Sequence, residues 1–220
     1  MNIQPIQGVI FDLDGVIVST DECHYQAWKR IADEECIPFD REVNERLRGV
    51  SRMESLMIIL EKASKAYTEE QKAEIAARKN AYYVELIAAL SAADILPGAI
   101  EALAVLRKHQ IKIAIGSSSR NAPLILTQIG LNDAFDAVAD GNQISKSKPD
   151  PEVFLLAAKQ LKLSPESCLV VEDADAGIEA ALSGGMTALG VGFAAKNPQA
   201  NYRAENLAEV DFAKLLHLEA

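Results

Sequence analysis

The chain has 220 residues, with 22 lysines and arginines against 32 aspartates and glutamates, which gives a formal net charge of −10. This acidic balance argues against a nucleic-acid partner, and no apolar run reaches the roughly 18 residues that a membrane span needs. The opening sequence, MNIQPIQG, shows neither the basic stretch nor the small-residue cleavage site of a signal peptide. We therefore expect a cytoplasmic protein whose partners are small molecules rather than nucleic acids or membranes.

The cysteine content excludes three further classes of protein. The chain has only three cysteines, Cys23, Cys36 and Cys168, and none of them form a CxxC pair. This spacing does not suit a disulfide scaffold, a zinc ribbon or a dithiol redox centre. No feature of the sequence calls for a second subunit, and we expect a monomer.

The N-terminal part begins with a strand and continues with helices. Gly8–Phe11 is a short apolar run that predicts a buried strand. From about residue 21 to residue 90, apolar residues recur at helical spacing, and Ser51 with Glu54 and Thr68 with Gln71 form the pattern of capping boxes. We expect about four helices here, forming a cap domain over residues 20–92, with hinges beside Thr20 and near residues 93–94.

The rest of the chain alternates between helix and strand after a turn at Leu96-Pro97-Gly98. Such alternation predicts an α/β fold, a doubly wound parallel sheet with helices on both faces. Residues 1–19 and 93–220 would form this core domain, into which the helical cap is inserted. We expect strands at 111–115, 137–139, 168–171 and 187–191, and helices at 99–109, 122–129, 151–161 and 176–184.

Polar residues follow the expected strands at the edge where open α/β sheets bind ligands. Each of four expected strands is followed by a group of this kind. Along the chain these are the carboxylates Asp12 and Asp14, the hydroxyl of Ser117, the lysine Lys148, and the carboxylates Glu172 and Asp173. Carboxylates with a lysine and a hydroxyl group suit chemistry on a phosphate.

Asp12 and Asp14 project to the same face if the backbone between them is extended. Crowded carboxylates need a cation, and Mg²⁺ takes one or two carboxylates together with water and a phosphate oxygen. One carboxylate could then attack phosphorus, while its neighbour passes a proton to the leaving oxygen. Ser117 and Lys148 would hold the oxygen atoms of the phosphoryl group.

Each of these elements also has an ordinary structural explanation. The Asp12-Leu13-Asp14-Gly15 segment could be a simple turn or part of a calcium loop, and residues 117–119 could cap a helix. Lys148 could be a solvated surface lysine, and Glu172 with Asp173 could favour a helix N-terminus through their charge. Their common order and their placement at strand ends favour a functional site.

Taken together, these motifs resemble those of the haloacid dehalogenase superfamily. The four motifs are Asp12-Leu13-Asp14-Gly15-Val16, Ser117 after its strand, Lys148 in Ser147-Lys148-Pro149, and Glu172-Asp173 followed by Ala176-Gly177. Three further segments, residues 20–28, 48–55 and 78–80, resemble the β-phosphoglucomutases within this superfamily, as does the segment at 117–121. The resemblance implies interconversion of β-D-glucose 1-phosphate and glucose 6-phosphate through β-glucose 1,6-bisphosphate.

The same resemblance assigns roles to individual residues. It makes Asp12 the nucleophile that is phosphorylated and Asp14 the general acid and base. It places Mg²⁺ on Asp12, the backbone carbonyl of Asp14, Glu172 and Asp173. Ser117 and Lys148 would bind the transferring phosphoryl group, and the other phosphate would lie on Arg52, Ser119 and Asn121. Residues near the sugar would be Thr20, His24, Arg48, Gly49, Val50, Ser51, Ser55 and Lys79.

Two positions depart from the family pattern, and two alternatives to a mutase stay open. Arg48 stands where lysine is common, and Ser118 stands where a small apolar residue is common. The first alternative is a sugar-phosphate phosphatase with the same core, in which water accepts the phosphoryl group. The second is a sugar-phosphate sensor without catalysis, against which the intact set of Asp12, Asp14, Ser117, Lys148 and Asp173 argues.

Overall fold

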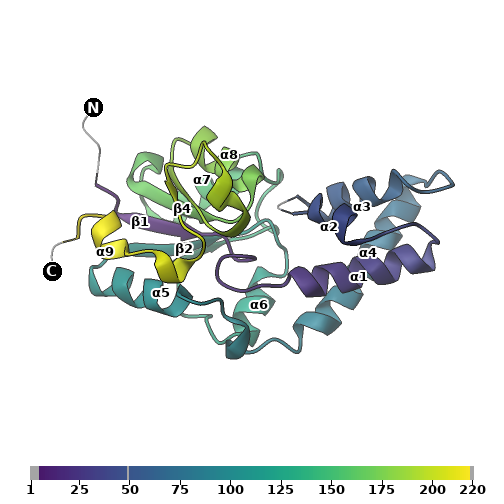
Figure 1. Cartoon of the computed structure of the whole chain (residues 1–220), viewed down its shortest axis with the longest axis horizontal. Helices are drawn as coiled ribbons and strands as arrows, with labels where there is room; N and C mark the ends of the chain where they lie inside the picture. Colours follow the sequence, from purple (N-terminus) through teal and green to yellow (C-terminus); the bar gives the residue numbers. More distant parts are fainter. Residues whose placement is uncertain (1–4, 49, 219–220) are drawn as a thin grey trace.

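A parallel sheet forms the centre of the larger lobe (Figure 1). The computed structural model describes residues 5–48 and 50–218, and within them six strands pair in the order β3-β2-β1-β4-β5-β6, all parallel. The strands are β1 (Gly8–Phe11), β2 (Lys112–Gly116), β3 (Ala137–Ala139), β4 (Cys168–Glu172), β5 (Thr187–Gly190) and β6 (Tyr202–Arg203). Phe11 at the end of β1 is opposite Ile115 and Val171. This register brings the residues that follow β1, β2 and β4 to one edge.

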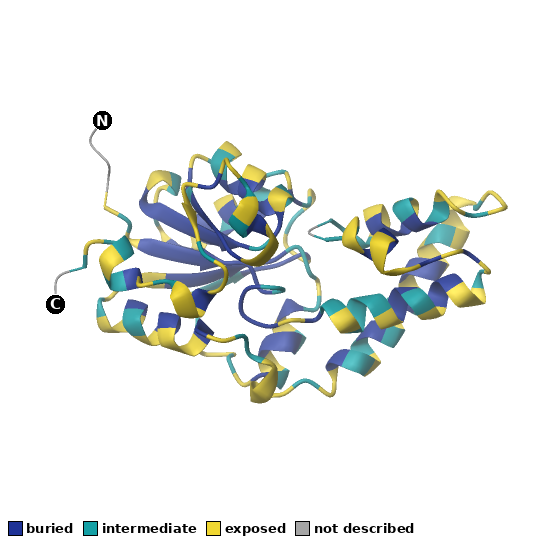
Figure 2. Cartoon of the chain, in the orientation of Figure 1, coloured by how far each residue is buried: buried dark blue, intermediate teal, exposed yellow. Residues whose placement is uncertain are grey.

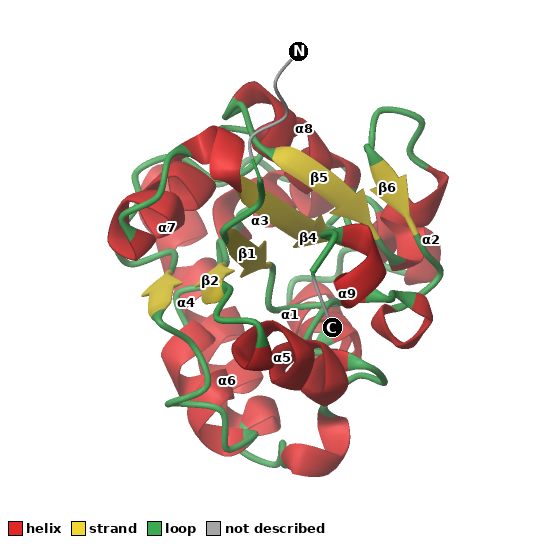
Figure 3. Cartoon of the chain, turned by 90° about the vertical axis from the view of Figure 1, so that its left-hand side faces the viewer, coloured by secondary structure: helices red, strands yellow, loops and turns green. Residues whose placement is uncertain are grey.

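Helices cover both faces of the sheet because the strands are apolar on both sides (Figures 2 and 3). Val9 and Phe11 face a cluster with α5, α6 and α9, whereas Ile10 faces a cluster with α7 and α8. These helices are α5 (Ala99–Lys108), α6 (Ala122–Gln128), α7 (Glu152–Leu161), α8 (Asp175–Ser183) and α9 (Phe212–Leu215). Short 3₁₀ turns are η1 (Ala92–Asp94), η2 (Pro165–Ser167), η3 (Gly192–Lys196) and η4 (Leu207–Glu209). The doubly wound α/β fold predicted from the alternation of elements is confirmed.

Four helices lie to one side of the sheet and have an apolar core of their own. They are α1 (Asp21–Glu34), α2 (Arg41–Glu45), α3 (Arg52–Leu60) and α4 (Glu69–Ile87). Their shared core includes Trp28, Ile31, Leu56 and Ile59. Both predicted capping boxes are present, at the starts of α3 and α4. Because each box satisfies two backbone N–H groups at a helix start, it fixes where the helix begins.

The two chain segments that join this helical group to the sheet lie against each other. Val18 forms an antiparallel bridge with Ile95, and the N–H of Leu96 donates to the carbonyl of Ile17 over 2.9 Å. We propose that this pairing of residues 17–18 with residues 95–96 marks the boundary between two domains. The core would contain residues 1–19 and 93–220, and the cap would contain residues 20–92. Because the two connecting segments are hydrogen-bonded to each other, the cap could rotate about them as a unit.

The elements differ from the sequence predictions mainly at their ends. The strand predicted at 111–115 is found one residue later, at Lys112–Gly116, and β6 and α9 were not predicted at all. β6 has two residues, both exposed, and α9 has four, so neither has a periodic pattern long enough to detect. Among the described residues, no helix is both long enough and apolar enough to cross a membrane.

Candidate active site

A cleft of about 490 Å³ is lined by residues from the carboxyl edge of the sheet and from the four-helix cap. Its volume is in the range of sites that bind a small molecule. Both parts of the chain contribute to its walls, and the sheet side carries all of the acidic, hydroxyl and lysine groups predicted from the strand ends. The core residues concerned are Asp12, Asp14, Ser117, Ser119, Asn121, Lys148, Glu172 and Asp173.

Lys148 lies between two carboxylates at the end of the sheet. Its Nζ donates to Oδ1 of Asp12 and to Oε1 of Glu172, each over 2.5 Å, and all three side chains are buried. Burial lowers the pKa of Lys148, but the two carboxylates raise it more, so it stays charged. Burial raises the pKa of Asp12 to about 7, although Lys148 opposes this. Oδ2 of Asp12 has no hydrogen bond from any described residue, which leaves it available to a ligand.

Asp173 and Glu172 come from the end of β4, and glycines make room for them. A Cβ at Gly177 would lie 1.9 Å from Oε1 of Glu172, and a Cβ at Gly15 would lie 2.2 Å from Oδ2 of Asp173. Gly15 also has a φ of +82°, which other residues rarely adopt. The two glycines therefore let the chain approach the carboxylates closely.

Asp173 lacks a cationic partner in the described part of the chain. Burial and the neighbouring carboxylates of Glu172, Asp12 and Asp14 raise its pKa to about 9. Such crowding of negative charge is relieved when a cation binds, and hard carboxylate oxygens are ligands that Mg²⁺ prefers. Because Lys148 lies between Asp12 and Glu172, no three His, Cys, Asp or Glu side chains among the described residues form a preformed metal cage. The donors fit an ion that keeps several waters rather than one that needs a closed cage.

The carboxylate of Asp14 is held by residues at the start of α1. The backbone N–H of Thr20 donates to Oδ1 over 2.8 Å, and the Thr20 hydroxyl donates to Oδ2. His24 Nε2 lies 3.4 Å from Oδ2, and His24 Nδ1 lies 2.8 Å from Nζ of Lys79. Burial raises the pKa of Asp14, but the interactions with His24 and Thr20 lower it by more. The pKa of Asp14 is therefore below its ordinary value. The cap thus orients the second aspartate of the Asp12–Asp14 pair.

Lys79 is buried in the cap although it carries an ammonium group. Only 2% of it is exposed, and burial together with Arg52 lowers its pKa to about 7. Its Nζ lies over the rings of Trp28 and Tyr83, and the Tyr83 hydroxyl donates to the Thr20 hydroxyl oxygen over 2.9 Å.

Burial and the neighbouring Lys79 lower the pKa of His24. A neutral His24 with its proton on Nε2 donates to Asp14 and accepts from Lys79.

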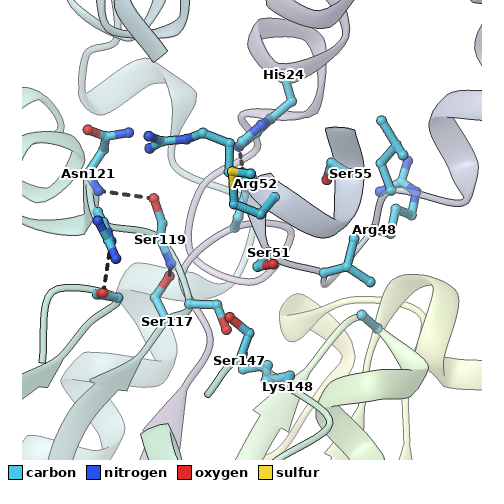
Figure 4. Close-up of a pocket in the computed structure, with 18 of the residues that line it drawn as sticks. His24, Arg48, Ser51, Arg52, Ser55, Ser117, Ser119, Asn121, Ser147 and Lys148 are labelled. Atoms are coloured by element: carbon cyan, nitrogen blue, oxygen red, sulfur yellow. Dashed lines mark hydrogen bonds and ion pairs between the residues drawn. The ribbon is translucent and has the colours of Figure 1, made fainter. Parts of the chain in front are cut away.

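The other end of the cleft is rich in hydrogen-bond donors (Figure 4). Arg52 from α3 and the side-chain amide of Asn121 from the core both donate to Oδ1 of Asn80, over 2.7 Å and 3.0 Å. Burial lowers the pKa of Arg52, and the charge of Arg120 lowers it further. Arg52 and the amide of Asn121 therefore meet here, and Arg120, whose Nε donates to the carbonyl of Gly141 over 3.2 Å, lines the same cleft. Guanidinium and amide donors of this kind suit a phosphate.

The loop after β2 turns between the two ends of the cleft. Ser117 Oγ accepts from the N–H of Ser119 over 3.1 Å, and Ser119 Oγ accepts from the N–H of Asn121 over 3.2 Å (Figure 4). The loop is packed tightly, since a Cβ at Gly141 would lie 2.3 Å from the carbonyl oxygen of Ser118. This loop places Ser117 beside the acidic end and Asn121 beside Arg52.

Most of the residues predicted to bind substrate line the cleft. These are His24, Arg48, Val50, Ser51, Ser55 and Lys79, together with the phosphate-binding candidate Arg52. Thr20 does not line it; this residue is fully buried and holds Asp14 instead. Gly49 lies outside the described residues. The Ser118 hydroxyl is buried in the cleft wall without a hydrogen-bond partner among the described residues.

Asn80, Arg120 and Tyr83 were missed as site residues by sequence reasoning. Asn80 is adjacent to the predicted Lys79, and Arg120 is adjacent to the predicted Asn121. This adjacency is the feature of the sequence that could have identified them as site residues. Tyr83 follows Lys79 by one helical turn, a spacing that is equally typical of core packing. Their roles depend on contacts between the cap and the core, which a sequence pattern does not specify.

The chain belongs to the haloacid dehalogenase-like hydrolases, whose family model matches residues 6–185. It is 50% identical to the β-phosphoglucomutase of Bacillus subtilis over 189 residues, which cover 85% of this chain and 84% of that protein. It is 33% identical to the phosphorylated carbohydrates phosphatase of Thermotoga maritima, over 82% of both chains. Among solved structures, the β-phosphoglucomutase of Clostridium difficile superposes with a TM-score of 0.91 at 41% identity and covers 96% of each chain. The resemblance predicted from the motifs is confirmed.

Proposed function

We propose that this protein is a phosphomutase that interconverts β-D-glucose 1-phosphate and glucose 6-phosphate through β-glucose 1,6-bisphosphate. The observation that carries the proposal is that one cleft has two ends whose side chains suit a phosphate. Asp12, Ser117 and Lys148 lie at one end, and Arg52 and Asn121 lie at the other. A mutase needs both ends because its bisphosphate must bind in two orientations. The 50% identity to a β-phosphoglucomutase supports the choice of sugar.

The first step is transfer of a phosphoryl group to Asp12. Oδ2 of Asp12 forms a bond to phosphorus while the bond from phosphorus to the sugar oxygen breaks, and Asp14 passes to that oxygen the proton that it takes from a sugar hydroxyl in the other half of the cycle. Lys148 binds Oδ1 of Asp12 and turns Oδ2 toward the ligand. The hydroxyl of Ser117 and the ammonium of Lys148 bind oxygens of the phosphoryl group.

The second step returns the phosphoryl group to the other sugar hydroxyl. That hydroxyl oxygen forms a bond to phosphorus, the bond from phosphorus to Asp12 breaks, and the hydroxyl proton passes to Asp14. His24 and Thr20 keep Asp14 in place during both steps through the contacts described above. The other phosphate of the sugar is held by Arg52, Ser119 and Asn121, with Arg120 adding positive charge.

We infer that Mg²⁺ is the cofactor, held by the carboxylates of Asp12, Glu172 and Asp173 and by the backbone carbonyl of Asp14. When bound, it neutralises the carboxylates and so lets an anionic phosphate approach Asp12. Among the described residues Asp173 has no cationic partner, and this and its raised pKa support the assignment. We also propose a cytoplasmic monomer that requires a sugar bisphosphate for priming.

A coupled assay tests the proposed function. β-Glucose 1-phosphate, Mg²⁺ and a catalytic amount of β-glucose 1,6-bisphosphate are added to the protein, and glucose 6-phosphate and inorganic phosphate are measured in the same sample. A mutase forms glucose 6-phosphate with little release of phosphate. Phosphate that accumulates as fast as sugar phosphate is consumed would support the phosphatase alternative, to which the relative from Thermotoga maritima points. The absence of any turnover would support a sensor.

A further inference from the structure

Arg48 belongs to the cap, but its guanidinium group contacts the core. It lies in the loop between α2 and α3, forms an ion pair with Asp21 of α1, and binds Glu45 of α2 over 3.0 Å. Because two carboxylates neutralise it within the cap, it has little charge left to offer a phosphate. The central carbon of the guanidinium, Cζ, lies over the ring of Phe193, 4.2 Å from the ring centre.

The backbone on either side of Phe193 is hydrogen-bonded to the backbone of two residues at the acidic end of the cleft. It lies in η3, and 57% of it is exposed, which is unusual for a large aromatic side chain. The next residue, Ala194, donates its N–H to the carbonyl of Asp173 over 2.9 Å, and Val191 donates to the carbonyl of Glu172 over 2.8 Å. A cap held against Phe193 is therefore held close to the carboxylates.

The cap also contacts the core at the opposite end of the cleft. There, Asn80 of α4 accepts a hydrogen bond from Asn121 of the core. The pair of Arg48 with Phe193 and the pair of Asn80 with Asn121 thus join the two lobes at the two ends. The second pair meets the candidate site for the distal phosphate, whereas the first lies beside the phosphoryl-transfer end.

We propose that Arg48 and Phe193 form a clasp that keeps the cap closed over the phosphoryl-transfer end, and so determines whether a sugar hydroxyl or water accepts the phosphoryl group from Asp12. This proposal rests on the proposed function and makes both residues positioning residues. In either case an oxygen forms a bond to phosphorus, the bond to Asp12 breaks, and the proton of the acceptor passes to Asp14. With water the product is inorganic phosphate. Because the chemistry is the same, exclusion of water decides the outcome.

An arginine suits this clasp better than a lysine. The guanidinium plane can stack on a ring while its edge donates to two carboxylates, whereas an ammonium group has no flat face. The arginine that departs from the family pattern at position 48 therefore has a function that lysine would serve less well. In this proposal, Arg48 acts on the closure of the cap rather than through the sugar contact predicted from the sequence.

The experiment compares four proteins: wild type, Arg48→Lys, Phe193→Ala and Phe193→Tyr. Each is given β-glucose 1-phosphate, Mg²⁺ and the bisphosphate primer, and the ratio of inorganic phosphate released to glucose 6-phosphate formed is measured. We expect the ratio to rise about fivefold in Arg48→Lys and Phe193→Ala and to stay near that of wild type in Phe193→Tyr. The double variant Arg48→Lys with Phe193→Ala should match the single variants, because both changes break one contact.

The outcomes separate the clasp from the proposed function. A wild-type protein that isomerises the sugar, with the same ratio in all variants, would overturn the clasp alone. A wild-type protein that only releases phosphate would overturn both. A ratio that rises equally in Phe193→Tyr would also contradict the clasp, since tyrosine keeps the aromatic face. Phe193 is exposed, so its variants are expected to fold, and thermal unfolding of each protein checks this.

Discussion

The buried charges around Asp12 show how single residues shape this site. Asp12, Glu172 and Asp173 bring three carboxylates to one edge, and Lys148 is the lysine that pairs with the first two. Burial and mutual repulsion raise the pKa values of Asp12 and Asp173 to about 7 and about 9. A site built for stability alone would not collect unbalanced carboxylates, because their repulsion costs free energy of folding. Binding of a cation and a phosphate, as proposed above, would offset this cost.

Asp12→Asn is predicted to abolish turnover while the fold survives. The amide cannot form the phosphorylated intermediate, so the rate should fall by at least about 1,000-fold. The rate of glucose 6-phosphate formation measures the effect, and circular dichroism with thermal unfolding shows that the fold is kept. Undiminished turnover would refute the assignment of Asp12 as nucleophile.

Lys79→Met is predicted to change the pH dependence of stability. Folding lowers the pKa of Lys79 from its usual 10.5 to about 7, mainly through burial. Between about pH 7 and pH 10 the unfolded chain binds a proton there that the folded protein lacks. The stability of wild type relative to Lys79→Met should therefore rise with pH in this window, by at most about 1.4 kcal/mol per pH unit. Below pH 7 the difference should be constant.

Urea unfolding at several pH values measures this dependence. Lys62→Met, at an exposed position of the cap, serves as the matched control and should show no such trend. A stability difference between wild type and Lys79→Met that stays flat from pH 7 to pH 10 would mean that Lys79 keeps its proton in the folded protein.

At the scale of elements, the sequence predicted those parts of the fold that have a local chemical signal. β1, β4 and the capping boxes at Ser51 and Thr68 are specified by their own residues, and they were located to within a residue. The motif residues were likewise predicted to meet, because the carboxyl ends of parallel strands share one edge. β6, α9 and the bridging role of Asn80 depend on tertiary contacts, which no local pattern reveals.

Gly177→Ala in α8 is predicted to impair the site although residue 177 contacts no ligand. Its Cβ would lie 1.9 Å from Oε1 of Glu172, whose two oxygens are already held by Lys148 and by the N–H of Ala174. The carboxylate must move, so Mg²⁺ affinity should fall about 10-fold to 100-fold. Titration of activity against Mg²⁺ measures the change. Glu179→Ala, at an exposed position of the same helix, should leave the affinity unaltered, and an equal loss there would contradict the steric explanation.

At the scale of the whole molecule, two lobes with separate apolar cores share one cleft. The core contributes the acidic end, and the cap contributes Arg52, His24 and Lys79. The segments that join the lobes are paired at Val18 and Ile95, which favours movement of the cap as a unit. Closure of the cap would bring the two ends of the cleft to a single sugar and exclude water from Asp12.

Removal of divalent metal is predicted to affect both activity and stability. A chelator should abolish turnover, and addition of Mg²⁺ should restore it. Because the ion relieves repulsion among Asp12, Glu172 and Asp173, Mg²⁺ should also raise the thermal unfolding temperature in the absence of substrate. An unfolding temperature that is independent of Mg²⁺ at millimolar concentration would contradict the carboxylate site.

The most direct measurement follows one labelled phosphoryl group through the protein. The protein is mixed with β-glucose 1,6-bisphosphate carrying a radioactive phosphate, quenched, and then analysed for label on Asp12; a second sample is chased with unlabelled β-glucose 1-phosphate. We predict that Asp12 carries the label and that the chase returns it to a glucose phosphate at the rate of turnover. Label that never binds to Asp12, or that leaves it only as inorganic phosphate in the presence of the sugar, would contradict transfer back to the sugar.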